Sequence, residues 1–150
     1  MTDAFEPASG DGAGPADAPG RAAEVRAAFE ALLAIRRVTS PTAADPEAVP
    51  APWEVHRAVR AVSLALEASG LPPSASAPDG ARTATGYRVA EGGRPGTVRV
   101  EWLGPPGSGA AHEAEARLRG CARVLTGLGW EALLYRGPGG RRYLEVERGA

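Results

Sequence analysis

The sequence predicts an α+β protein: an N-terminal helix pair followed by a strand-strand-helix-strand-strand unit, with a four-stranded antiparallel sheet and a helix on one of its faces. Three observations support this prediction. Apolar residues recur at helical spacing in three segments, and they alternate with polar residues in four shorter segments. Turns rich in Gly and Pro join the shorter segments in pairs, which is typical of hairpins.

The third predicted helix is the clearest element of the chain. Its apolar residues recur every three or four positions between Ala114 and Leu128, which is the spacing of one buried face. Gly129 can take the left-handed conformation that closes a helix, and Ser108 is a candidate N-cap. We therefore expect this helix to cross one face of the sheet, with Cys121 in the core.

Four strands surround this helix in the sequence. Their expected ranges are 85–91, 97–103, 131–136 and 141–147. Leu133 and Leu134 are adjacent in a strand and must point to opposite faces of the sheet. We therefore expect the N-terminal helices to cover part of the second face.

The remainder of the chain has three parts. Helical spacing over 21–38 and 53–69, with a proline-rich connector between them, predicts a helix pair. The first twenty residues carry four acids, no base and one large apolar residue, so they are not expected to bury enough surface to fold. The expected division is a disordered acidic tail (1–20), a helical hairpin (21–70), a flexible linker (71–84) and a ββαββ core (85–150).

The composition excludes several classes of function. All 17 basic residues are Arg, so the chain lacks the Lys of a Walker nucleotide site. This usage is typical of proteins encoded by high-GC genomes, such as those of actinomycetes. One Cys forms no disulfide framework, and we find neither a secretory-signal pattern nor an apolar run near the roughly 20 residues of a membrane span. We expect a cytoplasmic protein without membrane contact.

Candidate catalytic residues are few. Two His and one Cys complete no familiar metal set, and Cys121 lies on the expected buried face, where a core thiol is favoured over a nucleophile. Glu113 and Glu115 each precede an Arg by four residues, which is the spacing of surface ion pairs. We therefore expect no cofactor, no metal and no enzymatic activity.

One segment resembles a family of nucleases. The helix, Gly-Trp and hairpin over 125–146 are similar to the start of the HicA-type RNA-cleaving toxins, whose catalytic His lies on the second strand. Here the matching residues 140–143 read Gly-Arg-Arg-Tyr, so the catalytic residue is missing. A nuclease would require His112 beside an acid and an Arg in one cleft.

The remaining signal is a possible binding surface. The candidate residues are Arg99, Arg136, Arg141, Arg142 and Tyr143. We expect a small non-catalytic protein that binds a protein partner or itself, as an adaptor or a chaperone-like accessory factor. The alternative is a nucleic-acid-binding domain, since Arg and Tyr on a sheet face can hold and stack single strands. Glu101, Glu145 and Glu147 are expected on the same sheet face and would repel phosphate.

Overall fold

The computed structural model describes residues 5–15 and 19–149. Its helices are α1 (Arg21–Thr39), α2 (Pro52–His56), α3 (Ala58–Ala68) and α4 (Ala110–Gly127), with the 3-10 turns η1 (Pro46–Ala48) and η2 (Pro138–Gly140). Its strands are β1 (Ala75–Ser76), β2 (Arg82–Ala84), β3 (Gly86–Glu91), β4 (Val98–Leu103), β5 (Trp130–Arg136) and β6 (Arg142–Arg148). The prediction of a mixed protein with a four-stranded antiparallel sheet is confirmed, and the strand order is β3-β4-β6-β5.

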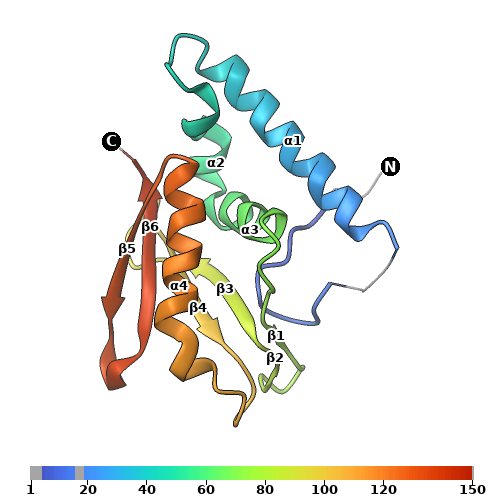
Figure 1. Ribbon diagram of the computed structural model, residues 1–150, viewed down its shortest axis with the longest axis vertical. Coiled ribbons are helices and arrows are strands. Elements are labelled where there is room, and N and C mark those ends of the chain that lie inside the picture. The colour runs from blue at the N-terminus through green and yellow to red at the C-terminus, as the bar shows by residue number, and fades with distance from the viewer. Residues whose placement is uncertain (1–4, 16–18, 150) are drawn as a thin grey trace.

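The main core lies between one face of this sheet and the helices α3 and α4 (Figure 1). Alternate residues of the strands point into it, as the period of two requires. The helix α4 contributes the apolar stripe that the sequence predicts, from Ala114 to Leu125. The fully buried residues of the core include Tyr87, Val100, Leu118, Cys121, Leu125, Leu144 and Val146.

The prediction that the N-terminal helices cover the second face is wrong. Helix α3 packs against β3 and α4 on the face that α4 already covers, and its residues Val62 and Leu66 belong to the same core. Its other side meets α1, where Leu64 packs with Val25 and Leu32. Because α3 is apolar on two sides, it fits between α1 and the sheet. No helix within the described residues packs on the second face, which we call the open face.

The predicted second helix is broken in two. Pro52 occupies its first turn, as expected, but Arg57 has φ −125° and ψ 55°, which ends α2 and turns the chain before α3. The predicted N-cap of α4 also differs, because Gly109 occupies the cap in the left-handed conformation while Ser108 Oγ accepts a hydrogen bond from the Ala110 amide at 3.3 Å.

A buried ion pair joins the helical part of the chain. Arg36 of α1 donates from Nε and Nη2 to both oxygens of Glu54 at 2.8 and 2.7 Å, and both side chains are essentially inaccessible. Arg36 Nη1 donates to the carbonyls of Glu47 and Leu128 at 2.6 Å each, and Glu54 also accepts from the Ala51 amide. One guanidinium therefore ties α1, η1, α2 and the C-terminal end of α4 together.

Residues 5–15 form an ordered strap, in contrast to the disordered tail expected over 1–20. The Ser9 carbonyl accepts from the Val89 amide at 2.7 Å, and the Ala8 carbonyl accepts from the Tyr87 hydroxyl at 2.8 Å. Gly12 exchanges hydrogen bonds with Ser76. The strap thus gains its order from the rest of the chain. The parts of the predicted tail at 1–4 and 16–18 lie outside the described residues.

The acidic residues of the strap face arginines. Asp11 pairs with Arg82 and Arg88 at 2.9 Å, and Glu6 pairs with Arg60 at 3.0 Å. Partial burial opposes ionisation of Asp11, but hydrogen bonds from Arg88 and Arg82 outweigh it and lower the pKa of this carboxyl. Its contribution to stability is therefore present above about pH 4 and is lost as the pH falls further.

The segment 71–84, expected to be a flexible linker, is also paired. It contains the short antiparallel hairpin of β1 and β2, and Pro73 forms a parallel bridge with Tyr87. The Tyr87 amide donates to the Pro72 carbonyl at 3.0 Å, and the Ser74 amide donates to the Tyr87 carbonyl at 2.8 Å. This segment and the strap together close the outer edge of β3.

We expect Arg36→Met to lower the free energy of unfolding by about 3–5 kcal/mol, because it leaves a carboxylate buried without its partner. Arg37→Met is the matched control. Its ion pair with Glu47 is exposed, with 48% and 45% accessibility, so its loss should cost less than about 1 kcal/mol. Urea denaturation of both variants measures the difference, and equal losses would contradict the assigned role of Arg36.

We expect Gly10→Ala to release the strap, whereas Gly12→Ala should leave it in place. Both residues have positive φ, so both substitutions carry a strain of about 1–2 kcal/mol. A Cβ at Gly10 would overlap the Tyr87 carbonyl oxygen, whereas nothing lies within 4 Å of one at Gly12. Hydrogen exchange at the Val89 amide should rise about tenfold or more in Gly10→Ala alone. Similar exchange in both variants would show that this contact does not hold the strap.

Candidate functional site

The five residues of the predicted binding surface lie in three places. Arg99 and Tyr143 share the open face of the sheet. Arg136 and Arg142 are paired across β5 and β6 on the opposite face, where Arg142 contacts Glu115 of α4 at 2.8 Å. Arg141 lies in the turn between these strands. The structure therefore does not bring the predicted arginines onto one surface.

The open face carries a cluster of aromatic rings. Arg99 lies 3.9 Å above the Tyr143 ring, and Tyr143 stacks on Tyr135 with ring centroids 5.7 Å apart. Carboxylates occupy the same face, where Glu101 pairs with Arg88 and Glu145 pairs with Arg94. Each of these two arginines is neutralised by a carboxylate, so the face is not a continuous basic surface.

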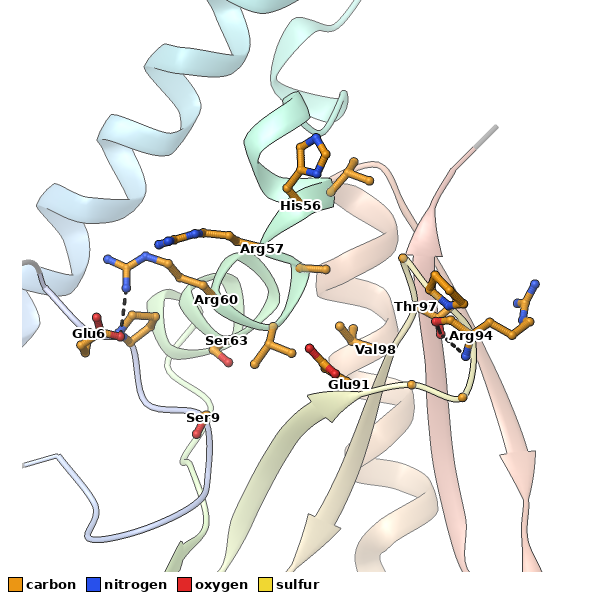
Figure 2. A pocket seen from close by; sticks show the side chains of 18 residues that line it. Glu6, Ser9, His56, Arg57, Arg60, Ser63, Glu91, Arg94, Thr97 and Val98 are labelled. Carbon is orange, nitrogen blue, oxygen red and sulfur yellow. Dashed lines mark hydrogen bonds and ion pairs between the residues drawn. The ribbon is translucent and has the colours of Figure 1, made fainter.

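A cleft of about 830 Å³ lies between the α2–α3 junction, the β3–β4 turn and the strap (Figure 2). His56, Arg57 and Arg60 line one side and Glu91 the other, while Glu6 holds Arg60 from the strap. The hydroxyl of Ser63 in its wall is buried and has no hydrogen-bond partner among the described residues. Among the described residues that line the cleft, no hydroxyl is hydrogen-bonded to a His, Asp or Glu side chain.

The other candidate catalytic groups are not assembled either. Cys121 is completely buried in the core, and burial raises the pKa of its thiol to about 11, which disfavours a thiolate. His112 is exposed at the start of α4 and makes no side-chain hydrogen bond or ion pair with any described residue. Glu113 and Glu115 pair with Arg117 and Arg119 at 3.6 and 3.4 Å, as their spacing predicts.

The outer edge of β5 is a site that the sequence analysis missed. Strand β5 is last in the sheet, and none of the described residues hydrogen bonds to its outer side. At one end of the β5–β6 pairing the Gly149 amide donates to the Gly129 carbonyl, and at the other end the Gly137 amide donates to the Arg141 carbonyl. The odd-numbered residues of β5 therefore belong to the hydrogen-bonded pairs with β6. Hydrogen-bonded pairs alternate along an antiparallel ladder. The backbone groups of Ala132, Leu134 and Arg136 therefore point outward.

A groove of about 470 Å³ runs beside this edge, between α4 and β5. Ala132 and Leu134 form its floor with Ala122 of α4, and Arg119 and Arg123 of α4 stand along its rim. On the opposite face of β5, Leu133 and Tyr135 are 47% and 41% exposed. The edge is thus flanked on both faces by apolar side chains. The one sequence signal for it was the adjacent pair Leu133-Leu134.

Comparison with protein-family models, with curated proteins and with solved structures found no match to this chain. None of the helices in the described part is long and apolar enough to cross a membrane. Within residues 5–15 and 19–149 there is no group of three or more His, Cys, Asp or Glu side chains placed to hold a metal ion.

We expect the stability of the protein to fall above about pH 8.5 because of Cys121. Its thiol titrates near this pH when unfolded, and its pKa is raised to about 11 in the fold. Its contribution to stability is therefore complete below about pH 8.5 and is lost as the pH rises toward 11, by at most about 1.4 kcal/mol per pH unit. Urea denaturation of the wild type and Cys121→Ala between about pH 8 and 10.5 measures this slope. Identical slopes would contradict the assignment.

Proposed function

We propose that the chain is a small non-catalytic protein-binding module that acts as an adaptor or accessory factor, and that it binds its partner by adding a strand to β5. The observation that carries this proposal is the outer edge of β5, which has no backbone partner among the described residues and has Leu133 and Tyr135 exposed beside it. Open strand edges are templates for another chain, and proteins commonly blunt them with charge, proline or a covering segment.

The two edges of the sheet are treated differently, which supports the proposal. The strap and the 72–74 segment cover the β3 edge with backbone hydrogen bonds to Tyr87 and Val89. The β5 edge has seven residues, no proline and no cover among the described residues. Strand addition joins main-chain hydrogen bonds, which supply affinity, to pockets for alternate side chains, which supply specificity. The α4–β5 groove is such a pocket.

The alternative function, nucleic-acid binding, draws support from the stacked Arg99, Tyr143 and Tyr135. The carboxylates of Glu101, Glu145 and Glu147 lie on the same sheet face and oppose phosphate binding. Binding of a labelled single-stranded oligonucleotide that weakens steeply with salt, and that falls in Arg99→Ala and Tyr143→Ala, would favour this alternative over strand addition.

We expect Ala132→Pro to abolish partner binding while the fold survives. The Ala132 amide points outward, so proline removes no hydrogen bond to β6 but takes a donor from the edge and obstructs an incoming strand. Ala132→Ser keeps the amide and is the matched control. The measurement is capture from host-cell lysate by the tagged wild type and both variants. We expect at least one protein to be captured by the wild type and by Ala132→Ser but not by Ala132→Pro.

Circular dichroism of Ala132→Pro shows whether it is folded. Leu133→Pro provides the contrast, because the Leu133 amide belongs to the ladder with β6 and its loss should destabilise the sheet. Identical capture by folded Ala132→Pro and wild type would overturn the assignment of β5 as the binding edge.

A further inference from the structure

The groove beside β5 has a strongly basic rim. Arg119 and Arg123 of α4 line the groove, and Arg136 lies beyond its lining on β5, on the same face as Leu134; these three arginines are the rim. Arg142, opposite Arg136, pairs with Glu115, which also contacts Arg119 at 3.4 Å. Glu115 is the one carboxylate paired with these arginines within the described chain, so the rim carries a clear excess of positive charge.

Two of these arginines are available to a ligand. Neither Arg123 nor Arg136 forms an ion pair or a side-chain hydrogen bond with any described residue, and both are exposed. On the open face, Arg88 and Arg94 are instead neutralised by Glu101 and Glu145. On its open face β5 itself carries the exposed carboxylate of Glu131, so the positive charge of this strand edge lies on the groove side, next to the outward-pointing backbone groups.

The two faces of an added strand would meet different surroundings. Successive side chains of a strand point to opposite faces. Those on the groove side would reach Arg119, Arg123 and Arg136, whereas those on the open side would contact Leu133 and Tyr135. A segment that alternates acidic and apolar residues matches both, because opposite charges and apolar pairs stabilise neighbouring strands.

A second copy of the chain matches this edge poorly. Antiparallel pairing of β5 with its own copy about a two-fold axis would place both α4 helices on the same face of a joined sheet. The rim arginines Arg119, Arg123 and Arg136 would then face their equivalents across the seam. Like charges brought together destabilise such a pairing. The charge of the groove thus favours an acidic partner over self-association.

We propose that β5 receives an extended acidic segment of another protein, in which carboxylate side chains facing Arg119, Arg123 and Arg136 alternate with apolar side chains over Leu133 and Tyr135. This inference rests on the proposed function, strand addition at β5, and specifies the chemistry of the partner. The segment pairs with the outward backbone groups of Ala132 and Leu134.

The test uses two labelled peptides of the length of β5, seven residues, one alternating Glu with Val and the other alternating Arg with Val. Fluorescence anisotropy with the full chain should show the acidic peptide binding about tenfold or more tightly than the basic one. This preference should weaken as salt rises, because the rim is partly exposed. The double variant R123E/R136E should reverse the preference, and A132P should abolish binding of both peptides.

Each other outcome overturns the inference in a distinguishable way. Equal binding of both peptides, still lost in A132P, would leave strand addition standing without selection for acid. No binding of either peptide, with lysate capture still lost in A132P, would point to a partner of other chemistry. A dimer that A132P dissociates would identify a second copy as the occupant. Unchanged binding by A132P would remove strand addition itself.

Discussion

The buried pair of Arg36 and Glu54 is the interaction on which the arrangement of the helices depends. Its guanidinium reaches the Leu128 carbonyl, where α4 ends, immediately before Gly129 and Trp130 begin the turn into β5. A Cβ at Gly129 would overlap the Ala48 carbonyl oxygen, so the η1 segment lies directly against this turn. A charge pair in the N-terminal half thus contacts the end of α4 and the turn that leads into β5, the two elements that line the groove.

The two edge strands of the sheet, β3 and β5, differ in whether their outer backbone groups are covered. Polar and charged contacts of the strap cover β3, including those of Asp11 with Arg82 and Arg88. At β5 the outward backbone groups have no hydrogen-bond partner in the described part of the chain, and Arg123 and Arg136 have no paired carboxylate there. Open strand edges can pair with other chains, and among the described residues the β5 edge is the edge of the four-stranded sheet that lacks backbone partners.

Sequence patterns predicted the sheet and α4 because these elements have strong local signals. Buried residues recur at every second position in β4 and at every third or fourth position in α4, because each element buries one face. Gly129 follows the end of the helix. The strap was missed because its order comes from partners distant in sequence. The placement of α3 was missed because two apolar sides do not specify which neighbour each one meets. The β5 edge was missed because strand order in a sheet is not local.

The strap also has a consequence for the order in which the protein forms. Asp11 lies 71 residues before Arg82 and 77 residues before Arg88 along the chain, and Ala8 lies 79 residues before Tyr87. During synthesis the N-terminal segment emerges first, yet its partners do not exist until more than half of the chain has been made. Contacts of such long separation form slowly, after local structure. The first described residues to leave the ribosome are therefore among the last to find their places.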